Sequence, residues 1–461
     1  MFFNINLIDI ALKCKQYCEI RVQQNQEISI AILNGDIVGN NITTIKGISA
    51  RSYCNGKWGF SSSSRISSDM AYELIKEAID NAKLISKKNS SIKLPSKPFK
   101  YYFNYDEIQN ILLNENQNIY IEYLKELDNY IYRNLKNIKS RLITFSQNIL
   151  TKDLATSDGS VYNVLYPRSY INISLSIEKD TEPFELSESF GGIGRFSSNF
   201  ANPSILFNKI DNLYENLIKK SEGIYPEASI KKCILDSSIS GMLAHEAIGH
   251  TVEADSIIGG SIAKDYLNKE VASSLITIVD FAHHYSSKIC DVPIFIDDEG
   301  TLAEDVVIIE NGILKNYLNS KDNCMKLKQN LTGNARANLY NDEPIVRMRN
   351  TAILPGNSKL SDMISSIDDG YYLLKSSGGQ ADTNGEFMFS ISYGYEIKKG
   401  KIGKAIKDTS ISGSSFQLLK TVDMVSDDFT WDSSGFCGKK QPIAVSIGGP
   451  AIRCDVLIGG R

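Results

Sequence analysis

Two histidines and a glutamate lie within six consecutive residues, in the segment His245-Glu246-Ala-Ile-Gly-His250. The chain has 461 residues and only four histidines, so half of them fall in this segment. Neutral imidazoles are common zinc ligands, and a carboxylate beside zinc can deprotonate the bound water, because the cation lowers the pKa of that water towards neutrality. The segment therefore predicts a hydrolytic zinc site, in which His245 and His250 bind the metal and Glu246 is the general base.

The spacing of these histidines predicts a distorted helix. They are five residues apart, whereas the metalloprotease motif His-Glu-x-x-His places them four apart. On a regular helix, residues five apart diverge by about 140°, compared with about 40° for residues four apart. Both imidazoles can bind one ion only if the helix is widened or broken. We expect a π-type bulge or a helix end at Gly249.

A surface or capping pair is the alternative interpretation of two histidines on one helix. Apolar residues at positions 242, 243, 247 and 248 favour a buried helix instead. Burying two imidazoles and a carboxylate without partners is costly, so burial favours the metal site.

A catalytic zinc ion usually has three protein ligands, so a third ligand must come from elsewhere. The candidates from the sequence are His283, His284, Glu253, Asp255 and the cysteines. Adjacent residues point to opposite faces of a strand, so only one of the two histidines could serve. Cys437 lies between glycines in Ser433-Ser-Gly-Phe-Cys-Gly-Lys, and its thiolate would be a good zinc ligand. Cys454 lies in an apolar, strand-like segment and is expected to be packed. Spacing alone does not decide among the candidates.

Composition excludes several other classes of function. The net charge is −4, and acidic and basic residues are mixed along the sequence, which argues against nucleic-acid binding. The first residues lack a basic leader and no run of about 18 apolar residues follows, so we expect a cytoplasmic protein without membrane contact. Eight cysteines without dense spacing predict free thiols or metal ligands and not a disulfide scaffold.

The first half of the chain mixes strand and helix patterns. Residues 19–62 alternate like strands around Asn34-Gly35 and Asn55-Gly56, which predicts a hairpin or meander. Further segments predict helices at 68–85, 106–139 and 207–222, strands at 141–164 and 169–179, and a loop at 86–100. A glycine-rich bend at 191–194 lacks the Lys-Ser/Thr ending of a phosphate loop.

The second half has a different texture. One helix at about 240–253 is followed by short strand-like segments at 276–279, 293–296, 306–309, 371–374, 387–391 and 443–447. Such spacing is typical of a mainly antiparallel β domain. We therefore predict an α+β fold with an α/β-sandwich-like N-terminal domain at 1–227, with possible substructure near 86–105. The C-terminal domain at 228–461 is β-rich and carries the metal-motif helix.

Several separate motifs, in order along nearly the whole chain, carry a family resemblance. They are Gly47-Ile-Ser-Ala-Arg51, Gly56-Lys-Trp-Gly-Phe60, Ala244-His-Glu-Ala-Ile-Gly-His-Thr-Val-Glu-Ala-Asp255, Asp297-Asp-Glu-Gly300, Gly333-Asn-Ala-Arg-Ala337, Arg347-Met-Arg-Asn-Thr351, Ser377-Gly-Gly-Gln380 and Gly435-Phe-Cys-Gly-Lys439. With these motifs the chain resembles the TldD/PmbA family of zinc peptidases, also called modulators of DNA gyrase.

The resemblance implies a set of ligands and an assembly. By position, His245, His250 and Cys437 would hold one zinc ion per subunit and Glu246 would be the general base. Members of the family resemble two-domain subunits that pair as homodimers or with a metal-free PmbA/TldE-type paralogue. Their metal sites face an internal cavity that admits unfolded peptides. Because all ligands are present, this chain resembles the TldD-type catalytic subunit.

Two segments leave their roles open. The segment Phe281-Ala-His283-His284 is unusual for the family, and we interpret it as a tolerant surface loop. Ser377, Gly378 and Gly379 could bind an extended peptide by strand addition, or could form a tight β-turn.

Two other functions compete with the peptidase. One is a zinc amidohydrolase that acts on a small non-peptide amide. The other is a non-catalytic, partner-binding protein with a structural metal, which would have a closed shell of four protein ligands.

Overall fold

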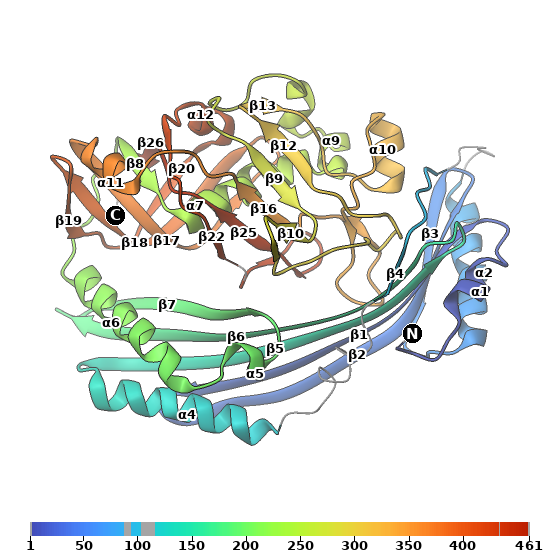
Figure 1. Ribbon diagram of the computed structural model, residues 1–461, viewed down its shortest axis with the longest axis horizontal. Coiled ribbons are helices and arrows are strands. Elements are labelled where there is room, and N and C mark those ends of the chain that lie inside the picture. The colour runs from blue at the N-terminus through green and yellow to red at the C-terminus, as the bar shows by residue number, and fades with distance from the viewer. Residues whose placement is uncertain (1, 87–93, 103–115, 433, 460–461) are drawn as a thin grey trace.

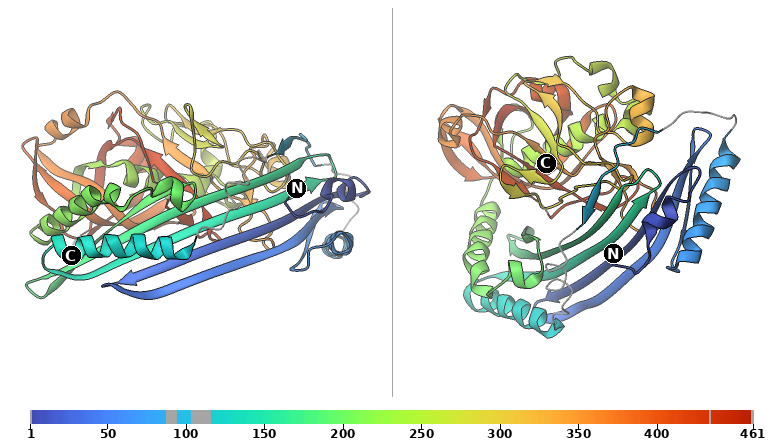
Figure 2. Two further views of the ribbon diagram at one scale, coloured as in Figure 1. Left: turned by 60° about the horizontal axis from the view of Figure 1, so that its bottom comes forward. Right: turned by 45° about the vertical axis from the view of Figure 1, so that its right-hand side comes forward.

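The computed structural model describes residues 2–459 except 87–93, 103–115 and 433. It has a mixed α+β fold. A long, curved sheet comes from the first half of the chain, and the second half packs over the inner face of that curve (Figures 1 and 2). The chain therefore places the motif helix in the half that lies above the long sheet.

The long sheet has seven strands in the order β3-β2-β1-β5-β6-β4, with β7 also paired to β6. Its pairings are antiparallel except for β4 with β6. The predicted turns at Asn34-Gly35 and Asn55-Gly56 are confirmed, and all four residues have positive φ as tight hairpin turns require. The strands are β1 Tyr17–Leu33, β2 Asp36–Cys54, β3 Lys57–Ser63, β4 Lys100–Tyr102, β5 Ile138–Thr156, β6 Val161–Lys179 and β7 Glu182–Ile193.

Helices cover the outer face of this sheet at both ends (Figure 2). At one end α2 buries an apolar stripe that includes Ala71, Leu74 and Ala78, and Ser67 caps its start by accepting a hydrogen bond from the backbone N–H of Met70. At the other end α4 and α6 bury the same kind of stripe. The helices of this half are α1 Leu7–Ala11, α2 Ser68–Ile85, α4 Gln117–Asn134, α5 Phe196–Asn199, η1 Pro203–Leu206 and α6 Phe207–Ser221.

The helix predicted at 106–139 ends earlier than expected at its C-terminal end. Its first part, up to residue 115, lies outside the described residues. It ends at Asn134, and β5 begins at Ile138. Between them Asn137 has a φ of 59°, a left-handed conformation that redirects the chain from helix to strand.

Two sheets build most of the second half. One has seven strands, and its pairings close into a ring because β17 pairs with both β8 and β18. The other has six strands in the order β13-β12-β9-β16-β25-β22. Most pairings are antiparallel, but β17 with β8 and β16 with β25 are parallel. The larger strands are β8 Ile230–Leu235, β9 Ile278–Phe281, β12 Val306–Glu310, β16 Asn350–Ile353, β17 Asp369–Ala381, β18 Glu386–Lys398, β19 Lys401–Ala405, β20 Thr409–Ser414, β25 Ser446–Gly449 and β26 Ile452–Ile458.

Short elements complete this half. The short strands are β10 His284–Tyr285, β11 Lys288–Ile289, β13 Ile313–Leu314, β14 Ala335–Arg336, β15 Ile345–Val346, β21 Met424–Val425, β22 Thr430–Asp432, β23 Phe436–Cys437 and β24 Ile443–Ala444. The helices are α7 Ser237–Met242, η2 Leu243–Gly249, α8 His250–Val252, α9 Ala254–Ile258, η3 Ile262–Tyr266, α10 Lys321–Leu327, α11 Leu360–Ser365 and α12 Ser415–Lys420. Among the described helices, none is long and apolar enough to cross a membrane. All eight cysteines are free thiols.

Buried ion pairs join the long sheet to the second half. Arg51 on β2 lies 2.6 Å from the carboxylate of Glu299, and Lys152 on β5 lies 2.5 Å from that of Asp298. Both acids belong to the Asp297–Gly300 motif, so this motif docks one half onto the other. The long sheet uses residues up to 193 and the other large sheets begin at 230. The division into domains at 227/228 stays a prediction.

A fully buried ion pair stabilises the six-stranded sheet. Asp280 on β9 accepts hydrogen bonds from Arg349, Thr351 and Asn334, and its carboxylate lies 2.8 Å from Nε of Arg349, with both side chains fully buried. We expect Asp280→Asn to lower the free energy of unfolding by about 3–5 kcal/mol, because it leaves the Arg349 charge buried without its counter-ion. Urea unfolding followed by circular dichroism measures the change.

The exposed pair of Arg65 and Glu73, 3.4 Å apart, provides the control. Glu73→Gln should change the same free energy by less than about 1 kcal/mol. An equally small effect of Asp280→Asn would contradict a stabilising role for the buried pair.

Candidate metal centre

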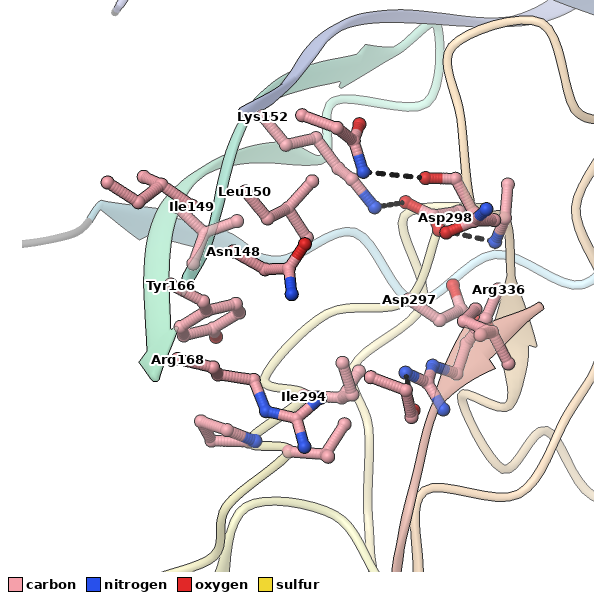
Figure 3. A pocket seen from close by; sticks show the side chains of 18 of the residues that line it. Asn148, Ile149, Leu150, Lys152, Tyr166, Arg168, Ile294, Asp297, Asp298 and Arg336 are labelled. Atoms are coloured by element: carbon pink, nitrogen blue, oxygen red, sulfur yellow. Dashed lines mark hydrogen bonds and ion pairs between the residues drawn. The ribbon is translucent and has the colours of Figure 1, made fainter. Parts of the chain in front are cut away.

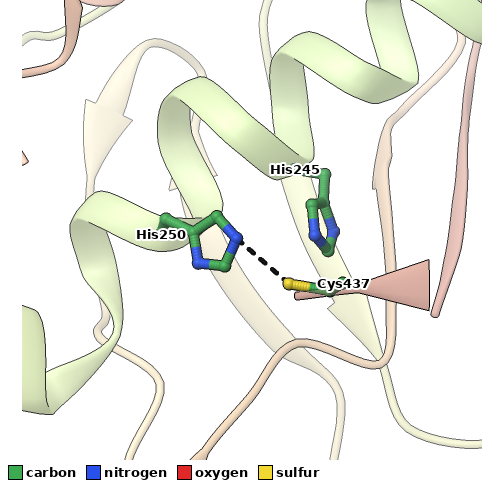
Figure 4. A group of neighbouring side chains, drawn as sticks. All are labelled: His245, His250 and Cys437. Carbon is green, nitrogen blue, oxygen red and sulfur yellow. Dashed lines mark hydrogen bonds between the residues drawn. The ribbon is translucent and has the colours of Figure 1, made fainter. Parts of the chain in front are cut away.

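The helix that carries the two histidines is widened, as the spacing predicted. Residues Leu243–Gly249 form a π-helical segment between α7 and α8. In such a segment the backbone hydrogen bonds join residues five apart, so side chains five apart lie on the same face. The distortion is thus longer than a bulge at Gly249 alone. It brings His245 and His250 to one side of the helix (Figure 4).

Close packing explains the glycine before His250. A Cβ atom at Gly249 would lie 1.8 Å from Sδ of Met348, in the segment that leads into β16. The widened turn also buries Leu243, Ala247 and Ile248 completely in the largest core. The helix is therefore fixed against the six-stranded sheet where the histidines project from it.

We expect Gly249→Ala to destabilise the chain by about 1–3 kcal/mol through this overlap. The same substitution should cost at least about 1 kcal/mol less in a chain that already carries Met348→Ala, because the clashing sulfur is then absent. Thermal unfolding of the four chains of this double-mutant cycle measures the coupling. Gly438→Ala is the control, since no atom lies within 4 Å of its added Cβ. Strictly additive effects would rule out the Met348 contact as the cause.

The structure brings three of the predicted site residues together. The ligand atoms of His245, His250 and Cys437 all lie within 4.8 Å of one another. Cys437 lies on β23, and its sulfur is 3.2 Å from Nε2 of His250, while the two imidazole rings are 5.2 Å apart and nearly perpendicular. Figure 4 shows the sulfur between the two rings. A residue far downstream thus completes a group with the motif helix.

The chemistry of these donors fits zinc. The His245 side chain is buried, and neither of its ring nitrogens has a hydrogen-bond partner among the described residues. Leaving a buried polar group unpaired is costly, and a cation shared with His250 and Cys437 would supply the missing partner. Two imidazole nitrogens and a thiolate are the donors that zinc accepts in tetrahedral sites.

The electrostatics of the group favour a thiolate. Burial alone would raise the pKa of the Cys437 thiol, but the adjacent imidazoles of His245 and His250 lower it to about 4. Burial lowers the pKa of His250, but the carboxylate of Glu253 and the sulfur of Cys437 outweigh burial and raise it to about 10. The thiolate is the form that binds metals, and a metal ion that binds would displace the His250 proton.

Glu246 lies beside the group on the solvent side. Its carboxylate is 3.7 Å from Nε2 of His250, and its side chain is 26% exposed, whereas His245 is almost fully buried. The carboxylate therefore reaches both the space next to the three ligand atoms and the solvent. This is the position that a general base acting on water requires.

The other ligand candidates lie elsewhere or play different parts. Glu253 contacts Nδ1 of His250, at 2.8 Å, on the ring edge opposite to Cys437. His283 and His284 contact each other at a short surface hairpin, where His283 stacks on Phe295. Cys454 is fully buried and lies opposite Cys233 in the pairing of β26 with β8. Of the described residues, only the group of three offers at least three clustered ligand atoms.

Two basic side chains without a role predicted from the sequence hold the hairpin that carries Cys437, which is formed by β23 and β24. The buried guanidinium of Arg347 donates to the carbonyl oxygens of Cys437, Lys439 and Gln441, at 2.6, 2.9 and 2.7 Å. Lys439 donates to Glu253 and to Asp255. Arg347 and Lys439 both belong to motifs of the family, and this could have marked them as functional. The sequence gives no indication of which groups they contact.

Residues 377–379 lie in a bulged strand, so the tight turn considered for them is wrong. Ser377, Gly378 and Gly379 belong to β17, which pairs with β18 through several register shifts. The other edge of β17 pairs with β8 only as far as Leu373, and no described strand pairs with that edge beyond it. The neighbouring residues 374–376 line a polar cavity between β17 and the long sheet.

A second cavity lies behind the hairpin with Cys437. Residues of β5 and β6, the segments 291–294 and 296–298, and Phe436 line it. Figure 3 shows the labelled members of this lining. Phe436 and Cys437 are neighbours on β23, so their side chains point to opposite faces. The charged groups drawn in Figure 3 include Lys152, which is paired with Asp298, and Arg336, which donates to the carbonyls of Met348 and Ala444. This cavity is separate from the three ligand atoms.

Comparison with known proteins places these features in one family. The models "PmbA/TldA metallopeptidase domain 1" and "PmbA/TldA metallopeptidase C-terminal domain" match residues 18–86 and 230–460. A "Zinc metalloprotease TldD homolog" of Saccharolobus solfataricus is 31% identical over 90% of this chain and 90% of its own. A "Metalloprotease TldD homolog" of Buchnera aphidicola subsp. Acyrthosiphon pisum is 33% identical over 99% and 95%.

Solved structures share the fold at low identity. TldE from Thermococcus kodakarensis superposes with a TM-score of 0.78 at 18% identity and covers 99% of both chains. A putative modulator of DNA gyrase from Thermotoga maritima reaches a TM-score of 0.75 at 17% identity, also with 99% coverage of both. These likenesses establish the same overall fold.

Proposed function

Because this chain belongs to the PmbA/TldD family of metallopeptidases, we propose that it is a zinc-dependent peptidase that hydrolyses small or unfolded peptides. One observation carries the proposal. The ligand atoms of His245, His250 and Cys437 lie within 4.8 Å of one another, and the carboxylate of Glu246 lies next to them. A set of two imidazoles, a thiolate and an adjacent carboxylate matches the requirements of metal-assisted hydrolysis.

In this proposal His245, His250 and Cys437 hold one zinc ion per subunit. When bound, zinc supplies a Lewis acid that acidifies water and polarises the scissile carbonyl. The burial of His245 and Cys437 excludes bulk water from one side of the site, while the partly exposed Glu246 borders the open side. A closed structural site with four protein ligands is less well supported, because no fourth ligand atom joins the group among the described residues.

Glu246 moves the proton in the proposed reaction. Its carboxylate accepts a proton from the attacking water and then donates that proton to the leaving amine. His250 faces the reaction space with Nε2 because its Nδ1 is engaged by Glu253. The same carboxylate thus serves first as a base and then as an acid, and the net reaction consumes one water per peptide bond.

The proposed docking element for the peptide is the unpaired edge of β17. Residues 374–381 have one free edge among the described strands, and β17 packs against both α7 and the π-helical segment. An extended peptide could add to this edge through its backbone, with Ser377, Gly378 and Gly379 offering groups without bulky side chains. This edge favours a peptide over a small non-peptide amide, which would not need a strand to bind.

The proposal extends to assembly. One solved structure of the same fold is called TldE, whereas the relatives of higher identity are called TldD homologues. We propose that this chain pairs either with its own copy or with a metal-free PmbA/TldE-type paralogue, and that the pair encloses the site in a cavity. Size-exclusion chromatography with light scattering, alone and with the paralogue, distinguishes the two assemblies.

Substrate assays test the proposed activity. The zinc-loaded protein is incubated with a mixture of unfolded peptides and, separately, with small amides, and products are identified by mass spectrometry. We expect cleaved peptides, loss of cleavage when a chelator removes zinc, and recovery when zinc is returned. Hydrolysis of small amides alone would favour the amidohydrolase. Zinc binding without any hydrolysis, alone or with the paralogue, would favour the structural metal.

A further inference from the structure

The orientation of His250 is fixed from behind by a buried carboxylate. Nδ1 of His250 lies 2.8 Å from Oε2 of Glu253, which is fully buried. A carboxylate accepts, so Nδ1 carries the hydrogen and Nε2 is left to face the sulfur of Cys437 at 3.2 Å. Glu253 reaches back because the helix ends at Val252 and Glu253 itself has an extended backbone, with ψ of 129°.

The same oxygen of Glu253 also accepts a hydrogen bond from the ammonium group of Lys439, on the other side of the site. Nζ of Lys439 lies 2.9 Å from Oε2 of Glu253 and 2.7 Å from Oδ1 of Asp255. Lys439 follows Cys437 by two residues, so this contact ties the hairpin with the sulfur to the end of the motif helix. A buried carboxylate is costly without compensation, and the ammonium of Lys439 provides it.

The hairpin that carries Cys437 needs a contact that fixes its position relative to the motif helix. Cys437 is 187 residues from His250 in the sequence and has glycines close on both sides, at 435 and 438. Arg347 holds the backbone of this hairpin through three carbonyl oxygens, and none of these hydrogen bonds involves a ligand imidazole. Lys439 links the hairpin that carries the Cys437 sulfur to Glu253, the carboxylate that orients the His250 ring.

We propose that Glu253 and Lys439 act as a latch that positions two of the three metal ligands. Glu253 sets the tautomer and direction of the His250 ring, and Lys439 fixes the Cys437 hairpin against Glu253. The latch rests on the proposed function, since it presupposes that the three ligands bind zinc. Both residues act through the ligands and are positioning residues.

Metal binding without turnover tests the latch. The variants are Glu253→Gln and Lys439→Met, with Lys440→Met as the matched control, because Lys440 is the exposed neighbour of Lys439. We expect the two latch variants to bind zinc about 10- to 100-fold more weakly in competition with a chromogenic chelator, and the control to bind like the wild type. Lys439→Arg keeps the cation and should recover most of the lost affinity.

Two spectroscopic signals separate positioning from general stability. The ¹⁵N spectrum of the zinc-loaded wild type should show one strongly hydrogen-bonded Nδ1–H of His250. In Glu253→Gln zinc on Nε2 still leaves the hydrogen on Nδ1, but the charged acceptor is lost, so this signal should shift and exchange faster with water. The thiolate-to-metal absorption of the cobalt-substituted protein should weaken in Lys439→Met and return in Lys439→Arg. A merely structural role would change thermal stability but leave both signals as in the wild type.

The outcomes distinguish the latch from the proposed function. If the wild type binds no zinc, the proposed function fails. If the wild type binds zinc and Lys439→Met, Lys439→Arg and Glu253→Gln all bind it within about twofold of wild type, the latch alone is wrong. If Lys439→Met does not fold, Glu253→Gln still decides, because a zinc affinity within about twofold of the wild type and an unchanged Nδ1–H signal of His250 in that variant would overturn the latch.

Discussion

Replacing Glu246 by Gln is expected to leave zinc bound and to slow peptide hydrolysis by about 10²- to 10⁴-fold. The amide of glutamine keeps the size and the hydrogen-bonding capacity of the side chain but cannot accept a proton from water. Glu246 lies 3.7 Å from Nε2 of His250 and is outside the group of three ligands, so its loss should not remove a metal donor. Zinc content by mass spectrometry and the rate of peptide cleavage are measured on the same preparation.

The control for this prediction is Glu73→Gln, a change of the same kind at an exposed residue of α2, far from the motif helix in sequence. It should leave both zinc content and cleavage unchanged. Turnover at the wild-type rate in the zinc-loaded Glu246→Gln protein would remove Glu246 from its role. Joint loss of zinc and activity would instead identify Glu246 as a ligand.

Local patterns predicted much of the fold where one feature dominates a segment. The Asn-Gly turns fixed the β1–β2–β3 meander, and the apolar spacing of residues 68–85 identified α2 at its observed bounds. The turn between β5 and β6 was missed, although Asp158-Gly159 marks it, because the start of β6 is buried on both faces and does not alternate. Strand β7 was also missed, and its Pro183 is tolerated because β7 is an edge strand.

In the second half, long-range contacts decide whether an apolar segment becomes a strand, and the sequence does not reveal those contacts. The segment 293–296 looked like a strand, but there only Ile296 forms an isolated bridge, with Leu302. Pro293, Ile294 and Ile296 instead line the cavity behind the Cys437 hairpin, and Phe295 stacks on His283. Burial in a cavity wall and burial in a sheet select the same residue types, so composition alone does not separate them.

The candidate site was predictable in its local part and not in its distant part. The five-residue spacing of His245 and His250 predicted the helix distortion, because helix geometry leaves no other way to bring both rings to one side. The choice of Cys437 came from resemblance, since no local rule spans the 187 residues from His250. Glu253 was a candidate ligand. Its actual contact with Nδ1 depends on where the helix ends, which the sequence did not specify.

Cys437→Ser is expected to weaken zinc binding by more than about 100-fold, because it replaces a ligand and not a group behind a ligand. The thiol has a pKa of about 4 beside the two imidazoles, so it is a thiolate donor at neutral pH, whereas a serine hydroxyl stays protonated and binds zinc poorly. Chelator competition measures the affinity. In the cobalt-substituted protein the thiolate-to-metal absorption should disappear completely, not merely weaken as with Lys439→Met.

The matched control is Cys14→Ser, which changes a partly exposed thiol in the segment between α1 and β1. It should retain both the affinity and the cobalt absorption of the wild type. The physical reason for the contrast is position: only the sulfur of Cys437 lies within reach of both motif histidines in the described residues. Equal zinc affinity in Cys437→Ser and the wild type would move the third ligand elsewhere, and with it the latch of Glu253 and Lys439 would lose the ligand it is proposed to position.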